Sequence, residues 1–232
     1  MTKEAHFLAA MLGKSKWFAS LADPIQAQMA AAAQVRRVKD GEAVYRQGDA
    51  PDGLYAMLQG RARLIAWSPG GVGCLLLLAA EGMWFGEVST IDAAPRQQDA
   101  IAQGACQVAR IPLAAIAELA ARQPELWRHI GRLACTHQRQ AISHIQDLLS
   151  LPRAARVAKV LLASVAGDDA PVAMTQDELA GTCGMGRQTA NAILGTLEQA
   201  GMVRLGYRVI WILDAERLAR VALGEICRTN KK

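Results

Sequence analysis

The stretch that decides the fold runs from Thr175 to Gly201 and reads TQDELAGTCGMGRQTANAILGTLEQAG. Thr175 followed three residues later by Glu178 is a capping-box pattern, which predicts a helix that ends near Cys183. The next residue, a glycine, can take the positive φ that a tight turn requires. A second helix is predicted to begin around Arg187 and to stop at Gly201. This stretch is therefore expected to form two short helices joined by a sharp turn.

The second of these helices has the composition of a DNA-reading helix. Its apolar stripe leaves the polar residues near its N-terminus facing away from the core. In a helix-turn-helix, such residues enter the major groove, where arginine pairs with guanine and glutamine or asparagine with adenine. Residues 202–213 then predict two short strands around Gly206, a wing whose arginines would contact phosphates. The predicted DNA contacts are Thr175, Gln176, Arg187, Gln188, Thr189, Asn191, Arg204 and Arg208. An ordinary helical hairpin with a solvated polar face is the alternative.

Composition and charge indicate a globular protein with a basic C-terminal half. The 232 residues are 52% hydrophobic, enough for proper cores in one large or two modest domains. Residues 110–232 hold 16 basic and 11 acidic residues, whereas residues 1–109 hold ten of each. The basic excess thus lies in the half with the helix pair, as a polyanionic partner requires.

The longest apolar run, Cys74 to Ala80, is too short to cross a bilayer, and the polar N-terminus lacks a signal-peptide pattern. A cytoplasmic protein without a membrane partner is expected. The five cysteines are odd in number and widely spaced, which predicts reduced thiols and neither a disulfide nor a metal cluster.

In the N-terminal half, the spacing of apolar residues changes along the chain. Residues 5–33 show helical spacing, and residues 35–111 show short apolar or alternating runs broken by glycine, which predicts an antiparallel sandwich or jelly-roll barrel. Within it, the glycines around Gly86 precede a short predicted helix, whose backbone N–H groups could face an anion that Arg96 would neutralise. A plain connecting loop is the alternative for this segment.

A long helix is predicted after Pro124. The positions that follow the spacing of a coiled-coil seam, expected to meet a second copy, are Trp127, Ile130, Ala134, His137, Ala141, His144 or Ile145, and Leu148. A second stripe, Leu126, Leu133 and Ile142, could rest on the barrel. His137 and His144 lie about 10 Å apart along such a helix and cannot share a metal within one chain, so they are interpreted as seam or surface residues. Pro152 breaks the helix, and residues 153–165 are predicted to begin the DNA-binding domain.

Taken together, the segments resemble the cyclic-AMP receptor protein/FNR family of bacterial transcription regulators over essentially the whole chain. The matching residues are the barrel signature YRQGDAPDGLY at 45–55 with Gly60, the Phe85-Gly86-Glu87 run, the helix at 153–162 and the helix-turn-helix quoted above. The resemblance implies a homodimer that binds double-stranded DNA, contacts RNA polymerase and carries a cyclic nucleotide or other small effector. The implied effector contacts are Gly86, Glu87, Val88, Arg96 and Gln97.

The chain departs from the cyclic-AMP-binding members where the effector would sit. Those members place an Arg-Ser pair on the cyclic phosphate, whereas this chain has Gln97-Gln98-Asp99 in that region, with Arg96 one residue early. An ionised Asp99 would repel a phosphate, by about 1 kcal/mol in water and more where water is excluded. Ala141-Ile142 replaces the Thr-Ser pair that contacts adenine. These departures argue against standard cyclic-AMP binding, and the lack of cysteine before Cys74 argues against an FNR-type oxygen sensor.

The predicted fold is α+β, with an N-terminal cyclic-nucleotide-binding-type β jelly-roll barrel, a long dimerisation helix and a C-terminal winged helix-turn-helix. The predicted domains are residues 1–123, 124–150 and 151–232. The predicted function is a sequence-specific, homodimeric transcription regulator on a palindromic site. Either a small ligand in the barrel controls it through a hinge near Ser150–Pro152, or the dimer is permanently competent to bind DNA. A ligand-binding module whose winged helix contacts protein is the alternative. No catalytic arrangement has supporting motif context, so an enzyme is not expected.

Overall fold

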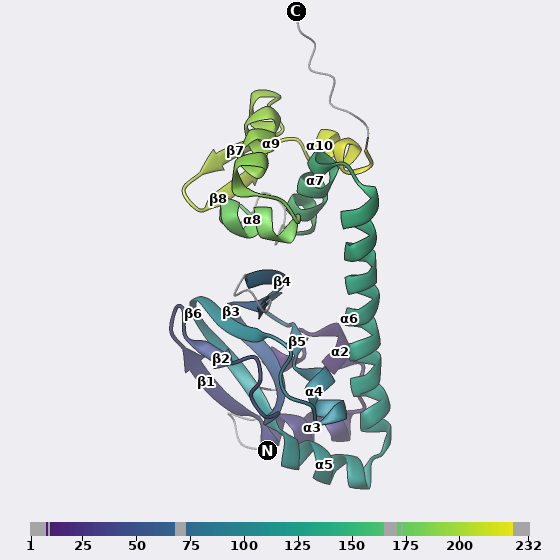
Figure 1. Cartoon of the computed structure of the whole chain (residues 1–232). Coiled ribbons are helices and arrows are strands. Elements are labelled where there is room, and N and C mark those ends of the chain that lie inside the picture. The colour runs from purple at the N-terminus through teal and green to yellow at the C-terminus, as the bar shows by residue number, and fades with distance from the viewer. Residues whose placement is uncertain (1–7, 9, 68–72, 165–170, 173, 225–232) are drawn as a thin grey trace, which may run out of the picture. The chain divides into compact units, whose positions relative to one another are not determined.

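The computed structural model describes residues 8, 10–67, 73–164, 171, 172 and 174–224, and its contacts divide the chain into two compact units, residues 1–139 and 140–232 (Figure 1). Parts of the predicted N-terminal helix, the end of the helix predicted at 153–165 and Cys227 lie outside the described residues. Among the residues that the structure describes, no helix combines the length and apolar character needed to cross a membrane.

The first unit is built around one antiparallel sheet flanked by short helices. The sheet order is β1-β6-β3-β4, with β2 also on β6 and β5 also on β3. The strands are β1 (Gln34–Val38), β2 (Ala43–Tyr45), β3 (Gly53–Trp67), β4 (Gly73–Ala80), β5 (Trp84–Phe85) and β6 (Asp99–Pro112). The helices before, between and directly after the strands are α2 (Lys16–Ala19), α3 (Asp23–Ala32), α4 (Glu87–Asp92) and α5 (Leu113–Arg122). Buried Phe18, Trp84 and Ile116 join the helices to the sheet in one core.

The sequence predicted more strand breaks than the structure contains. Gly60, one of the glycines that break the apolar runs of the sequence, lies inside β3, which is 15 residues long. Its φ of +80° and the register shifts between Met57 and Arg61 interrupt the regular pairing without ending the strand. A Cβ at this position would lie 2.8 Å from the Cβ of Cys106 on β6, so the close approach of the two long strands requires glycine.

The long helix α6 (Glu125–Ser150) forms as predicted, but two of its apolar positions face differently from the prediction. Ile130, expected in the seam, is fully buried in the core of the first unit beside Leu126 and Leu133. Ile142, expected on the barrel, is 54% exposed. The apolar side chains of α6 form two neighbouring stripes, and periodicity alone does not reveal which stripe the barrel covers.

The second unit is a small helical domain with a β-hairpin (Figure 1). Its elements are α7 (Arg153–Ala163), α8 (Gln176–Thr182), α9 (Arg187–Gln199), β7 (Val203–Gly206), β8 (Val209–Ile212) and α10 (Ala215–Ala222). Leu161, Leu179, Leu194 and Leu218 bury one side chain from each helix in a common core. The helix-turn-helix and the hairpin are thus confirmed, and with the antiparallel sheet they confirm the predicted α+β class.

The end of α6 is attached to the second unit by two contacts across the predicted hinge. The Lys159 ammonium on α7 lies 2.6 Å from a carboxylate oxygen of Asp147 on α6. Leu148 packs near Gly184, where an added Cβ would stand 3.0 Å from its Cδ2 atom. Asp147 is therefore held against α7, and Leu148 against the turn of the helix-turn-helix.

Candidate DNA-binding surface and effector site

The turn between α8 and α9 has the geometry that the sequence predicted. The Thr175 hydroxyl accepts from the Glu178 N–H at 3.2 Å, and the Glu178 carboxylate accepts from the Thr175 N–H at 2.8 Å, which completes the capping box. Gly184 has a φ of +60°. The Arg156 guanidinium donates to the Cys183 carbonyl at 2.8 Å and so fixes the end of α8. These bonds hold α9 on a rigid support.

Arg187 and Gln188 are exposed at the N-terminal end of α9, while Thr189 is half-buried. The Arg187 guanidinium lies 3.2 Å from the carboxylate of Asp177 on α8, and both side chains are more than half exposed. Such an exposed pair stabilises the fold by less than about 1 kcal/mol, so Arg187 can leave it at little cost. The arrangement presents one arginine and one amide side chain on a helix end.

The remaining predicted contacts on the helix pair are less open. The Thr175 hydroxyl is engaged in the capping box, and Gln176 beside it is half-buried. Asn191 is half-buried, and its Oδ1 atom is shielded from solvent without a hydrogen-bond partner among the described residues. Arg187 and Gln188 are therefore the best exposed candidates for reading bases.

The hairpin β7–β8 places both predicted wing arginines on the surface. The Arg204 guanidinium lies 4.6 Å from the ring centroid of Trp211 on the neighbouring strand, a cation–π contact that holds the charge at the surface. Arg208 lies in the turn and is exposed. The Leu205 N–H donates to the carboxylate of Glu198 at 2.8 Å and thereby attaches the wing to the end of α9.

In the first unit, the predicted effector carboxylate already has a partner. Glu87 begins α4, is 6% exposed, and its Oε1 atom lies 2.9 Å from Nδ1 of His137 on α6. Sequence reasoning assigned His137 to the seam, but the structure turns it toward the barrel. Its spacing of seven residues places it on the same face of α6 as the buried Ile130, but that spacing does not indicate whether the face meets the barrel or a second copy.

Arg96 lies inside the barrel wall and is 2% exposed. Its guanidinium donates to the Gly86 carbonyl at 2.9 Å, to the Gly53 carbonyl at 2.6 Å and to the Asp52 carboxylate at 2.9 Å. It also lies 4.5 Å from the centroid of the Tyr45 ring. The guanidinium therefore binds groups of the protein itself. Its contact with an effector phosphate stays a prediction.

The carboxylate of Asp52 receives two further donors besides Arg96. Arg110 donates to it at 2.7 Å and the Tyr55 hydroxyl at 2.7 Å. Burial works against ionisation, but the hydrogen bonds from Arg110, Tyr55 and Arg96 hold the pKa of Asp52 below its usual range. Burial and the bond to Asp52 raise the pKa of Tyr55 to about 12. Asp52 belongs to the barrel signature, yet sequence alone did not indicate that it would partner Arg96.

Asp99 is also satisfied within the protein. Its buried carboxylate accepts from the Gln47 N–H at 2.7 Å, from the Trp67 indole at 2.9 Å and from Arg46 at 3.2 Å. Burial opposes ionisation, but these donors lower the pKa of Asp99. The two other predicted effector residues, Val88 and Gln97, are exposed.

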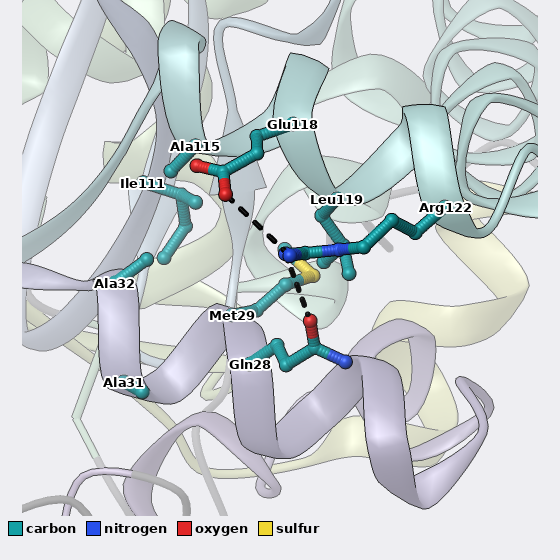
Figure 2. Close-up of a pocket in the computed structure, with 9 residues that line it drawn as sticks. All are labelled: Gln28, Met29, Ala31, Ala32, Ile111, Ala115, Glu118, Leu119 and Arg122. Atoms are coloured by element: carbon teal, nitrogen blue, oxygen red, sulfur yellow. Dashed lines mark hydrogen bonds and ion pairs between the residues drawn. The ribbon is translucent and has the colours of Figure 1, made fainter.

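A separate groove lies between α3 and α5, and Figure 2 shows the residues around it. It has a volume of about 290 Å³. Met29, Leu119 and Ile111 give it an apolar floor, and Arg122 crosses its rim with a bond to Gln28 at 3.2 Å. None of the predicted effector residues lines this groove.

Comparison with known proteins relates both units to one architecture. The family model of the cyclic nucleotide-binding domain matches residues 35–123, and that of the Crp-like helix-turn-helix domain matches residues 155–221. A CRP-like cAMP-activated global transcriptional regulator of Mycobacterium tuberculosis is 30% identical over 190 residues, covering 78% of this chain and 85% of that protein. The cyclic AMP receptor protein of Thermus thermophilus is 30% identical over 193 residues, covering 82% of this chain and 89% of that one.

Solved structures agree with the sequence relatives. A transcriptional regulator of the CRP/FNR family from Thermus thermophilus superposes with a TM-score of 0.69 at 26% identity, covering 82% of this chain and 98% of that chain.

Proposed function

We propose a mode of action for this chain, which belongs to the CRP/FNR family of DNA-binding transcription regulators. The observation that carries the proposal is the exposed N-terminal end of α9, where Arg187 and Gln188 project from a helix pair fixed by its capping box and by Arg156. In this proposal α9 enters the major groove, and Arg187 reads guanine through its two parallel donors. A protein-binding winged helix is the less favoured alternative.

The phosphate contacts are assigned to the periphery of the same surface. Arg204 and Arg208 on the wing, and Thr175 with Gln176 at the start of α8, would position the protein on the backbone, while Gln188, Thr189 and Asn191 would contact bases or adjacent sugar. Phosphate contacts set register, whereas base contacts set sequence preference. The net positive charge of the second half of the chain supports a polyanionic partner.

A homodimer is proposed through the exposed face of α6. Ile142, Ile145 and Leu149 are 54%, 54% and 84% exposed and follow steps of three and four residues. A second copy of the same helix would cover this stripe as in a coiled coil. Two reading helices then predict a palindromic site whose half-sites are about one helical turn apart. Replacing Ile142 and Ile145 by glutamate should yield monomers in sedimentation analysis, and an unchanged mass would refute this interface.

The barrel is proposed to regulate DNA binding through a small effector near Gly86, Glu87, Val88 and Gln97. Because His137 already bonds to Glu87, an effector hydroxyl must displace that imidazole or share the carboxylate. Arg96 would act by holding the Gly86 carbonyl rather than by touching the effector. Calorimetry with cyclic AMP tests this arrangement: weak or no binding is expected, and micromolar or tighter binding would contradict it.

The DNA-binding proposal is tested by selection from a random duplex library. The parent protein should select duplexes that share a symmetric motif. Arg187→Ala should bind that motif with about 1–3 kcal/mol less binding free energy and lose selectivity at one base-pair position. Arg220→Ala, which removes an exposed charge on α10, is the matched control and should keep the same motif. If the parent retains no motif at low salt, or if Arg187→Ala selects the parent's motif unchanged, the proposed role of α9 is wrong. Localisation in the cytoplasm and contact with RNA polymerase belong to the same proposal.

A further inference from the structure

The groove between α3 and α5 has the size of a small-molecule site, and none of the predicted effector residues lines it. Its volume of about 290 Å³ is at the low end of the range for such sites, which suits a ligand about the size of an amino acid. The space exists because Ala32 on α3 and Ala115 on α5 line it with nothing larger than a methyl group. A longer side chain at either position would fill it.

The floor of the groove is aliphatic and fixed in position. Met29, Ile111 and Leu119 are 0%, 1% and 4% exposed and belong to the packed core of the first unit. Among the described residues that line the groove, none carries an aromatic ring. An aliphatic group fits this floor, and its removal from water would supply the apolar part of the binding free energy.

The rim of the groove carries one charge of each sign. Figure 2 shows the Arg122 side chain lying across the rim, with its guanidinium between Glu118 on α5 and Gln28 on α3. The guanidinium donates to the Glu118 carboxylate at 3.5 Å and to the Gln28 amide oxygen at 3.2 Å. The Arg122 and Glu118 side chains are 60% and 72% exposed, so their ion pair contributes little to stability. Both charges can therefore take other partners at little cost.

These two charges discriminate between ligands by the charge that the ligand carries. A ligand with only a carboxylate would be attracted by Arg122 and repelled by Glu118, and a ligand with only an ammonium group would meet the reverse. A neutral apolar ligand would use neither charge. A ligand that carries both groups side by side satisfies the whole rim, because it replaces one exposed ion pair by two.

We propose that this groove binds a free aliphatic α-amino acid such as leucine. The α-carboxylate accepts from the Arg122 guanidinium, the α-ammonium group donates to the Glu118 carboxylate, and the branched side chain lies on the aliphatic floor. Gln28 holds the guanidinium over the groove from the opposite helix. All of these residues lie in the first unit, so the inference does not depend on the proposed DNA contacts.

Calorimetry of the full-length protein with L-leucine tests the proposal. A dissociation constant on the order of 100 μM is expected for a ligand of this size. Isocaproate is leucine without its ammonium group, and isoamylamine is leucine without its carboxylate. Each should bind about tenfold more weakly than leucine or worse, because each leaves one rim charge facing a repulsive or missing partner. Glycine, which has both charges but no aliphatic side chain, should also bind at least about tenfold more weakly.

Substitutions on the rim should change which ligand is preferred. Glu118→Gln should weaken the binding of leucine about tenfold and make isocaproate bind as well as leucine does, because the repelling carboxylate is gone. Arg122→Gln should do the same in favour of isoamylamine. Arg37→Gln removes an exposed arginine of β1 that does not line the groove, and this matched control should bind leucine as the parent does.

A third variant tests the space itself. Ala115→Leu should abolish leucine binding by filling the groove, and thermal unfolding shows whether this variant and the rim variants keep the parent's fold. If the parent gives no heat of binding with millimolar leucine, or if Glu118→Gln and Arg122→Gln both bind leucine as the parent does, the groove is not an amino-acid site. If isocaproate binds to the parent as tightly as leucine, the site takes simple carboxylates and the proposal is overturned.

Discussion

Replacing Arg96 by alanine should destabilise the barrel, because both terminal nitrogens of its buried guanidinium are bonded within the fold. The substitution removes three charged hydrogen bonds, to two backbone carbonyls and to Asp52, and a stacking contact with Tyr45. Asp52 keeps its bonds from Arg110 and Tyr55, which limits the loss. Breaking a buried ion pair in this way costs about 3–5 kcal/mol, and we expect the lower end of that range. Domains of this size have free energies of unfolding of about 5–15 kcal/mol, so a loss of this size is readily measured.

Urea unfolding followed by tryptophan fluorescence measures this loss. Four of the five tryptophans lie in the first unit, so the signal reports mainly on the barrel. Arg96→Lys keeps the charge but not the planar set of donors, and it should lose roughly half as much free energy of unfolding. Gln97→Ala, an exposed neighbour, should change the free energy by less than about 0.5 kcal/mol. If the free energy of unfolding of Arg96→Ala lies within about 1 kcal/mol of the parent's value, the arginine is not a structural residue.

Three further predictions concern single side chains. His137→Ala should lower the free energy of unfolding by about 1–3 kcal/mol, because it leaves the buried Glu87 carboxylate without its partner. In a double-mutant cycle with Glu87→Ala, additive losses of unfolding free energy would exclude an interaction between the two side chains. Because the pKa of Asp99 is lowered in the folded state, its ionised form stabilises the protein above the unfolded pKa of about 3.9, and this contribution is lost as pH falls through the folded pKa. Below about pH 4, the free energy of unfolding of Asp99→Asn should therefore fall less steeply with pH than that of the parent. Equal slopes for the two proteins would contradict this role of Asp99. Asp177→Asn should raise affinity for DNA, as measured by gel shift, because it releases Arg187 and removes a negative charge beside the phosphates, whereas weaker binding would mean that the ion pair orients Arg187 for reading.

Local features of the second unit could be predicted from the sequence because short-range chemistry determines them. The capping box at Thr175 and the positive φ of Gly184 each depend on a few neighbouring residues. The start of α9 at Arg187 followed from the same local pattern. Such features are recognisable in any sequence that contains them.

The features that sequence reasoning missed depend on contacts between distant segments. The Arg96 cluster joins residues 44 positions apart at Asp52, and the bond from His137 to Glu87 spans 50 positions. Nothing in the local pattern distinguishes an arginine that faces an effector from one that holds two loops together. Which stripe of α6 is buried was equally undetermined, because both Ile130 and Ile142 fit a helical period.

The attachment of Asp147 to α7 and of Leu148 to the turn after α8 has a practical consequence for dissecting the protein. A fragment that starts at residue 151, the boundary suggested by the proline, would cut away the carboxylate beside Lys159 and the leucine that covers Gly184. A fragment that starts near residue 140 keeps both. Limited proteolysis should accordingly spare the segment between these two positions, and the shortest excisable DNA-reading piece should carry the last turns of the long helix with it.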